Sequence, residues 1–266
     1  MVITQRGTAV IEHELTVILP AAGEGNRLGL DTPKELLELI PGVRLIDFSL
    51  RHIRAAAGKK HIQVAVVTRP WKASVVEYVK EQLPGIKVEA VLFNDMYHEW
   101  PGSVYSANEF FSADNLVLLP DSYLSLATDS PLETPAITGS GGKTLAELVS
   151  AALSRHGVVF GCISCTDKER LRSLGAVRIE NRIITAFQDK PGSHEEKIPF
   201  NGFWGCYAFR KEMGKPLYDF LAHSVRHRSL PLQAQTFYPM GIIPVARYED
   251  LGTWENIEKF KKEKSD

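Results

Sequence analysis

Residues 15–37 read LTVILPAAGEGNRLGLDTPKELL, an apolar strand that runs directly into a glycine-rich loop carrying Arg27 and Lys34. Gly23 and Gly25 allow the backbone to adopt positive φ and to bring its N–H groups close to an anion. The arginine and the lysine add full positive charges to these backbone dipoles. Glycines alone are equally compatible with an ordinary turn after a strand, but the offsets of the arginine and of the Pro-Lys pair favour an anion-binding loop.

The composition is that of a folded protein with a small net charge. Of the 266 residues 44% are hydrophobic, which is enough for a large core, and the formal net charge is −1. A global basic field of the kind that holds nucleic acid is therefore excluded, and any anionic ligand has to be bound by a local site. Three cysteines do not make a disulfide framework in a chain of this length.

The sequence contains no segment expected to enter or cross a membrane. Its apolar runs are much shorter than the roughly 20 residues that a membrane span requires. Residues 1–15 lack a basic start followed by an apolar stretch, so no signal peptide is expected. A cytoplasmic location without membrane contact is the default expectation.

Strand-like and helix-like segments alternate through the first half of the chain. The pattern predicts strands at 15–19, 62–67, 88–92 and 116–119, and helices at 45–57, 72–83 and 103–111. Because right-handed crossovers place helices on both faces of such a sheet, we expect an α/β fold with a Rossmann-like mixed, mainly parallel sheet flanked by helices. Ligands bind beyond the carboxyl ends of the strands in sheets of this kind.

The second half is richer in strands. The pattern predicts a hairpin at 176–187, an aromatic strand at 202–209, a helix at 211–221, a strand at 242–247 and a terminal helix. A small β-rich part is therefore expected in the second half of a single domain that spans residues 1–266. Residues 128–142 are rich in Pro, Gly, Ser and Thr and are the best candidate for a long surface loop, whose role as a lid is left open.

Two acidic residues stand where strands end. Asp121 follows the apolar strand that ends at Leu119, and Asp250 follows the strand at 242–247. If both strands lie in one sheet, both carboxylates face its carboxyl edge, where the glycine-rich loop also opens. Two carboxylates together with phosphate oxygens are the usual surroundings of Mg²⁺. Either Asp taken alone is equally compatible with a capping role in the helix or turn that follows it.

The glycine-rich loop resembles the signature of nucleotidyltransferases that make nucleotide-sugars, such as the glucose-1-phosphate thymidylyltransferases. The matching residues here are Ala21, Ala22, Gly23, Gly25, Asn26, Arg27, Leu28, Pro33 and Lys34. Asp121 falls at the first metal-binding aspartate of this family, and residues 249–253 resemble the region of the second, which places it at Asp250. Residues 187–191, with Lys190, resemble the Glu-Lys-Pro segment, and Asn201-Gly202 is similar to the sugar-facing segment.

The resemblance implies a role for each of these positions. Arg27 and Lys34 would bind the triphosphate together with the loop, Lys190 would bind the attacking phosphate, and Mg²⁺ would lie at the two aspartates. Asn201 and Gly202 would face the acceptor. The implied partners are a nucleoside triphosphate and a small phosphorylated acceptor, and a homo-oligomer is left open. About 15–125 would then form the nucleotide-binding half and about 157–255 the acceptor-phosphate-binding half.

The chain departs from the family pattern at several positions. Asn26 replaces the usual Thr or Ser, Asp189 replaces the usual Glu, and no glycine precedes Asp121. Pro20 is typical of the cytidylyltransferases of isoprenoid synthesis, and residues 94–106, NDMYHEWPGSVYS, resemble a segment of the choline-phosphate cytidylyltransferases. A cytidylyltransferase for a non-sugar phosphate or phosphonate is therefore the alternative activity. An inactive nucleotide-sugar-binding regulatory module is the alternative from another class.

Some residues have ordinary structural explanations as well. Gly102 and Ser103 form a plausible turn facing the base or ribose, but Ser103 could equally cap a helix, and Lys190 could be a solvated lysine at the end of a hairpin. Residues 138–144 resemble a phosphate-binding P-loop but lack its first glycine. The CxxC at 162–165 lies in a strand-like run without further ligands, and the histidines at 223 and 227 lie in a basic stretch, so neither indicates a metal site.

Overall fold

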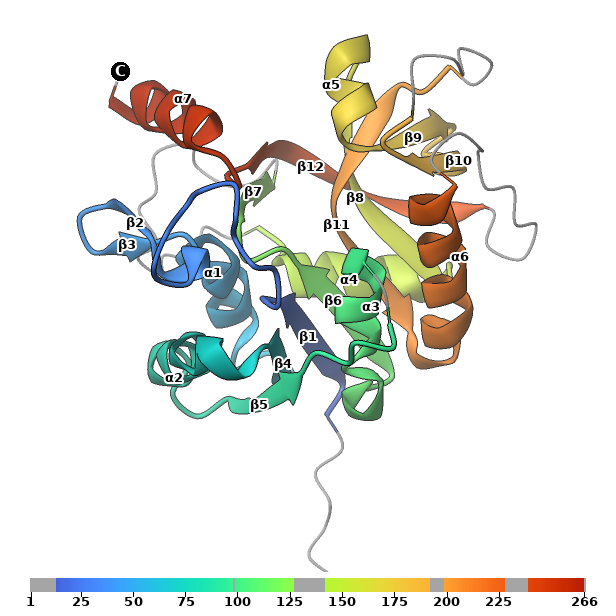
Figure 1. Cartoon of the computed structure of the whole chain (residues 1–266). Helices are drawn as coiled ribbons and strands as arrows, with labels where there is room; N and C mark the ends of the chain where they lie inside the picture. Colours follow the sequence, from blue (N-terminus) through green and yellow to red (C-terminus); the bar gives the residue numbers. More distant parts are fainter. Residues whose placement is uncertain (1–12, 98, 127–141, 192–198, 228–238, 266) are drawn as a thin grey trace, which may run out of the picture.

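The computed structural model describes residues 13–97, 99–126, 142–191, 199–227 and 239–265 (Figure 1). Its centre is a 10-stranded sheet in which β5, β4, β1 and β6 run parallel. The strands are β1 Leu15–Pro20, β4 Ile62–Thr68, β5 Lys87–Leu92, β6 Asp114–Leu118, β7 Ser122–Leu126, β8 Val158–Ser164, β9 Gly175–Glu180, β10 Ile183–Asp189, β11 Gly202–Arg210 and β12 Met240–Asp250. A separate hairpin consists of β2 Glu38–Ile40 and β3 Val43–Arg44. The predicted mixed, mainly parallel architecture is confirmed.

Seven α-helices and four short 3-10 helices surround the sheet in the described part of the chain. The α-helices are α1 Asp47–Ala56, α2 Ala73–Gln82, α3 Glu99–Tyr105, α4 Leu145–Leu153, α5 Lys168–Ser173, α6 Gly214–Arg226 and α7 Trp254–Ser265. The 3-10 helices are η1 Lys34–Leu36, η2 Pro70–Lys72, η3 Asn108–Phe110 and η4 Lys211–Met213. No helix in these described ranges is long and apolar enough to cross a membrane.

Strand β1 shows why the sheet is covered on both faces. Val17 and Leu19 belong to the same core cluster as residues of α1, α2 and α4, whereas Ile18 belongs to the cluster that contains residues of α3 and α6. Successive side chains of a strand point to opposite faces, so an all-apolar strand requires a helical layer on each side. The parallel strands β4 and β6 flank β1, which places its carboxyl end in the middle of this half of the sheet.

The strands of the second half close on themselves. Strand β11 pairs with β8, β8 with β12, β12 with β10 and β10 with β9, and β9 pairs again with β11. These five strands therefore form a small ring, while the pairing of β11 with β6 joins the ring to the parallel strands of the first half. The predicted β-rich second half is confirmed, and its hairpin is β9 with β10.

Three predicted elements have different bounds from those expected. The helix predicted at 103–111 is α3 at Glu99–Tyr105, followed by the separate 3-10 helix η3, and its earlier start agrees with Pro101 in the first turn. The helix predicted at 211–221 is η4 followed by α6, which continues to Arg226. Strand β12 extends to Asp250 because its end pairs with β7, a strand that the pattern did not predict. Residues 128–141 of the expected long loop lie outside the described residues.

Helix α4 begins with a capping box that makes a testable contribution to stability. The Glu147 carboxylate accepts hydrogen bonds from the backbone N–H of Thr144 (2.7 Å) and from its hydroxyl (2.8 Å). These bonds, with a smaller contribution from Lys59, lower the pKa of Glu147 from 4.5 to about 2. Because the folded-state pKa is depressed, the stabilisation is present above pH 4.5 and is lost as the pH falls through about 2.

We expect Thr144→Ala to raise the pKa of Glu147 and to lower the urea concentration at the midpoint of unfolding at pH 7, because the cap is lost. An NMR titration of the side-chain carboxyl measures the first effect and urea unfolding the second. Ser154→Ala, at the other end of α4, is the matched control. An unchanged Glu147 pKa in the Thr144 variant would contradict the assignment.

Candidate active site

The glycine-rich loop leaves the end of β1 and passes from the core to the surface. Ala21 is fully buried, and its N–H donates to the Val67 carbonyl of β4 (2.8 Å), whereas Gly23 is exposed. Gly25 has a φ of +75°, a conformation that residues with a Cβ rarely adopt. The loop therefore presents backbone at the carboxyl edge of the sheet, as the sequence predicts.

Lys34 folds back onto this loop. A Cβ placed on Gly25 would lie 3.7 Å from the Lys34 Cδ, and one placed on Gly23 would lie 4.0 Å from the Lys34 Nζ. The aliphatic part of the lysine thus packs along the two glycines, and its ammonium reaches the start of the loop. The two glycines and the lysine of the sequence motif form one local structure.

The Lys34 ammonium forms an ion pair with Asp121, which follows β6. The Lys34 Nζ donates to Asp121 Oδ2 at 2.5 Å, and the two side chains are 12% and 20% exposed. Burial alone would lower the pKa of Lys34 and raise that of Asp121. Each partner's charge outweighs this effect, so the pKa of Lys34 lies above its ordinary value and the pKa of Asp121 lies below. Both groups are therefore charged at neutral pH.

Asp250 is brought to the same edge by the pairing of β7 with β12. Asp250 is the register partner of Ser122, and the N–H of Leu251 donates to the Asp121 carbonyl (3.0 Å). Burial, followed by the negative charges of Asp250 and Asp121, raises the pKa of Tyr248 well above its ordinary value. Both carboxylates therefore raise the pKa of the same buried Tyr248 hydroxyl. The predicted meeting of the two aspartates at one edge of the sheet agrees with this arrangement.

Arg27 reaches the turn that follows Asp250. A Cβ placed on Gly252 would lie 2.8 Å from the Arg27 Nη2 and 2.9 Å from the Asp250 Oδ1, which itself accepts the Gly252 N–H (2.8 Å). Helix α7 also contacts the glycine-rich loop region, because the Trp254 indole N–H donates to the Leu28 carbonyl (3.0 Å). Glycine at 252 therefore leaves room for the guanidinium beside the carboxylate.

The donor set at this edge fits Mg²⁺. Asp121 and Asp250 offer hard carboxylate oxygens, and Mg²⁺ is commonly held by one or two carboxylates, with waters and substrate phosphates completing its coordination. Within the described ranges, no group of three or more His, Cys, Asp or Glu side chains is arranged to hold a metal by itself.

Gly102 and Ser103 lie inside α3, which packs against β1. A Cβ on Gly102 would lie 2.7 Å from the Tyr97 carbonyl carbon, so the glycine is required by the close approach of this turn. Both placements expected from the sequence, a turn ahead of the helix and a helix cap at Ser103, are wrong because the two residues lie in the interior of α3. Its buried hydroxyl has no hydrogen-bond partner among the described residues. A role in binding the nucleotide stays a prediction.

Lys190 directly follows β10 and has the left-handed backbone conformation, with a φ of +47°. Its N–H donates to the Leu174 carbonyl (3.0 Å), and its side chain is exposed. In the described part of the chain, its ammonium makes no hydrogen bond or ion pair. The lysine is thus held through its backbone and its charge is available to an anion, but no described contact joins it to the glycine-rich loop.

Asn201 and Gly202 have clear structural roles at the start of β11. The Asn201 side chain accepts the Ile179 N–H (2.7 Å) and donates to the Ile179 carbonyl (2.9 Å). A Cβ on Gly202 would lie 2.8 Å from the Ile163 carbonyl oxygen. The amide therefore continues the pairing with β9, and the glycine allows close strand packing. Contact of either residue with an acceptor stays a prediction.

Sequence reasoning missed a buried charge pair beneath the loop. Lys72 is 1% exposed, and its Nζ donates to the Glu35 Oε1 (2.8 Å), to the Ala21 carbonyl (2.6 Å) and to the Gly23 carbonyl (2.8 Å). The available signal was its position directly after β4, the parallel neighbour of β1. Lysine is almost always exposed, however, and nothing in the sequence indicated its burial.

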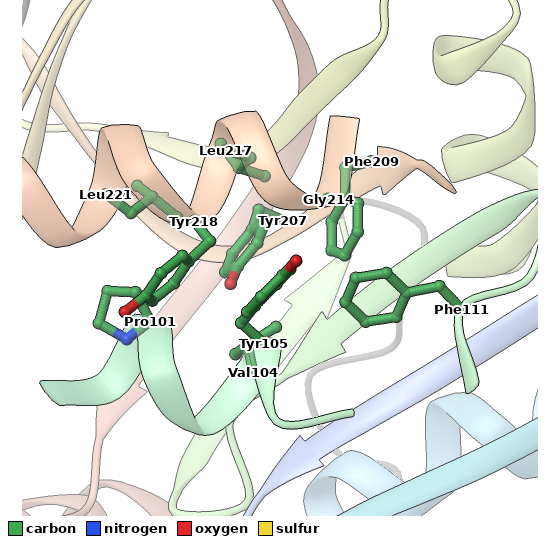
Figure 2. A pocket seen from close by; sticks show the side chains of 10 residues that line it. All are labelled: Pro101, Val104, Tyr105, Phe111, Tyr207, Phe209, Gly214, Leu217, Tyr218 and Leu221. Carbon is green, nitrogen blue, oxygen red and sulfur yellow. The ribbon is translucent and has the colours of Figure 1, made fainter. Parts of the chain in front are cut away.

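A recess between α3 and α6 is apolar and lies outside this charged site (Figure 2). The residues that line it are Pro101, Val104, Tyr105, Phe111, Tyr207, Phe209, Gly214, Leu217, Tyr218 and Leu221. None of the predicted site residues contributes to it. The recess is a packing gap between two helices and the sheet, and it offers no charge to a phosphorylated ligand.

Solved structures of nucleotidyltransferases share this fold over nearly the whole chain. UDP-glucose pyrophosphorylase from Acinetobacter baumannii aligns with a TM-score of 0.68 at 16% identity, over 94% of this chain and 92% of that one. The inositol-1-phosphate CTP transferase from T. maritima aligns with a TM-score of 0.63 at 15% identity, over 95% of both chains. No protein-family description and no curated protein sequence matches the chain.

A third structure is assigned to the family that the sequence motif resembles. A protein assigned as a glucose-1-phosphate thymidylyltransferase from Bacillus anthracis aligns with a TM-score of 0.67 at 16% identity, over 95% of this chain and 96% of that one. The chain therefore has the nucleotide-diphospho-sugar transferase fold, and the resemblance read from the loop is confirmed for the fold. At these identities, the activity has to be argued from the site.

Proposed function

We propose that this protein is a nucleotidyltransferase that joins a nucleoside triphosphate to a small phosphorylated acceptor and releases pyrophosphate. A sugar 1-phosphate is the first candidate acceptor, and the product is then a nucleotide-sugar. The observation that carries the proposal is the convergence of the glycine-rich loop, Lys34, Asp121 and Asp250 at one edge of the sheet. A protein that only binds a nucleotide-sugar has little need of two carboxylates beside a triphosphate loop.

The chemistry needs positioning and charge neutralisation more than a general base. A phosphate monoester has a second pKa of about 6, so its oxygen is already anionic at neutral pH. This oxygen attacks the α-phosphorus of the triphosphate, the new P–O bond forms, and the bond to the β-phosphate oxygen breaks to release pyrophosphate. Repulsion between the two anions is the main obstacle, as in other phosphoryl transfers.

The proposed roles follow the positions of the charges. The loop, Arg27 and Lys34 bind the triphosphate on the side from which pyrophosphate leaves, and Lys190 binds the acceptor phosphate. Asp121 and Asp250 would hold Mg²⁺, which would neutralise charge on the phosphates when bound. Lys34 contacts Asp121 in the absence of substrate. The ammonium proposed for the triphosphate and the carboxylate proposed for Mg²⁺ therefore already lie side by side.

A substrate matrix tests the proposal directly. Purified protein with Mg²⁺ is incubated with each nucleoside triphosphate and a panel of sugar 1-phosphates, inositol 1-phosphate, choline phosphate and simple phosphonates, and pyrophosphate is measured. Release with one pair of substrates identifies both the base and the acceptor. Turnover with CTP and a non-sugar phosphate would favour the alternative cytidylyltransferase. No release from any pair would contradict the enzyme and favour the regulatory module.

The role of Lys190 gives a separate prediction. We expect Lys190→Gln to raise the KM for the acceptor about tenfold or more, because a charge-assisted contact to phosphate is lost, and to leave the KM for the triphosphate unchanged. Lys87→Gln, at an exposed lysine paired with Glu89 on β5, is the matched control. An equal rise in both KM values would show that Lys190 does not act on the acceptor.

A further inference from the structure

The buried ammonium of Lys72 lies directly under the glycine-rich loop. Its three donor hydrogens have three partners, because its Nζ is within 2.8 Å of the Ala21 carbonyl, the Gly23 carbonyl and the Glu35 carboxylate. Lys72 lies in η2, which follows β4. The Lys72 ammonium therefore binds two carbonyls of the loop and one carboxylate of η1 at the same time.

These bonds fix the orientation of two peptide planes in the loop. In a trans peptide, the carbonyl of one residue and the N–H of the next point in opposite directions. When the Ala21 and Gly23 carbonyls face Lys72, the N–H groups of Ala22 and Glu24 consequently face away from it. Within the described residues, neither of these N–H groups donates a hydrogen bond. Lys72 thus leaves two oriented donors without a protein acceptor.

The third bond of Lys72 reaches the short helix η1, which contains Lys34 and Glu35. Glu35 directly follows Lys34, the residue that pairs with Asp121. Glu35 is fully buried, and its negative charge offsets the positive charge of Lys72. The pair therefore orients the loop carbonyls and adds little net positive charge beneath the loop. The second carboxylate oxygen of Glu35 has no partner among the described residues, which makes the ammonium its main support.

We propose that Lys72 is a positioning residue that holds the glycine-rich loop with the N–H groups of Ala22 and Glu24 turned toward the phosphates of the nucleotide. This inference rests on the proposed function, because the triphosphate is the ligand that the loop is held to receive. Without Lys72, the two carbonyls lose their buried donor. The peptide planes can then rotate and present carbonyl oxygens, which repel phosphate, in place of N–H groups.

Two variants separate positioning from simple stabilisation. Lys72→Met keeps the length of the side chain but leaves the Glu35 carboxylate buried without a counter-charge, so a loss of stability is also expected. The double variant Lys72→Met/Glu35→Gln removes both charges, and a neutral buried pair of similar shape restores much of the stability. Neither variant restores the two bonds to the loop carbonyls. Lys59→Met, which breaks an exposed ion pair with Glu147, is the matched control.

The affinity is measured by titration calorimetry with inorganic tripolyphosphate and with each ribonucleoside triphosphate, all with Mg²⁺. We expect the double variant to melt within about 3 °C of the wild type, and both variants to bind triphosphate about tenfold or more weakly. Recovery of wild-type affinity in the double variant would overturn the inference, as would full affinity in Lys72→Met. Wild-type protein that binds no probe and releases no pyrophosphate would instead reject the proposed function, and the inference with it.

Discussion

Asp121→Asn is expected to reduce pyrophosphate release by about a thousandfold or more, because a metal ion typically contributes several kcal/mol to the stabilisation of such a transition state. The amide keeps the shape of the carboxylate but loses the charge that would hold Mg²⁺. It also leaves the Lys34 ammonium without its ion pair. The rate is measured with the substrate pair that the matrix identifies, across a range of Mg²⁺ concentrations.

The fold is expected to survive this substitution. The Lys34–Asp121 pair is mostly buried, so the loss of one partner should cost about 3 kcal/mol of unfolding free energy, which is less than the total stability of a typical domain. Asp114→Asn is the matched control, since Asp114 begins the same strand β6 and pairs with Arg210 at the opposite end. Activity of Asp121→Asn within a few-fold of the wild type would remove Asp121 from the proposed metal site.

Lys34→Gln is expected to lower kcat/KM for the triphosphate by about a hundredfold or more, because a charge-assisted contact to the leaving phosphates is lost. The raised pKa of Lys34 keeps its ammonium charged below and through its ordinary value of 10.5. Its contribution should therefore be constant between pH 6 and 9, and the loss of activity in the variant should be the same across this range.

Steady-state kinetics with varied triphosphate and saturating acceptor measure this effect. Lys215→Gln, at an exposed lysine paired with Asp219 on α6, controls for the loss of one positive charge. A variant whose KM for the acceptor rises while its kcat/KM for the triphosphate is retained would show that Lys34 serves the other substrate.

The sequence predicted the local part of the candidate site, a glycine-rich loop after an apolar strand with Lys34 nearby. In the structure, Lys34 packs along Gly23 and Gly25 of this loop, whereas its role in binding a triphosphate stays a prediction. The carboxyl-edge rule for parallel strands predicted that Asp121 and Asp250 meet. The strand β7 was missing from this prediction. Asp250 is still part of β12, which continues past 247 because it pairs with β7.

Other features depend on contacts between distant parts of the chain. The burial of Lys72 follows from two carbonyls and a carboxylate that come together only in the folded sheet. The Asn201 side chain hydrogen-bonds to the backbone of Ile179 because β9 pairs with β11 and closes the ring. No local sequence pattern indicates this pairing. The capping box of α4, by contrast, is a local sequence signal at 144–147, and the start of this helix could have been predicted from it.

Strand β12 belongs to both halves of the molecule. Its first residues pair with β8 and β10 inside the ring, and its last residues pair with β7, where Asp250 and the turn beside Arg27 begin. The strand changes partners along its length, because residues 240–244 pair within the ring and residues 245–250 pair with β7 after a register shift between Val245 and Arg247. Under the proposed function, a change in the ring that accommodated a different acceptor would act on the same strand that carries Asp250, one of the two proposed metal ligands. We therefore expect a change of acceptor to leave nucleotide binding intact only in variants that keep the register of β12.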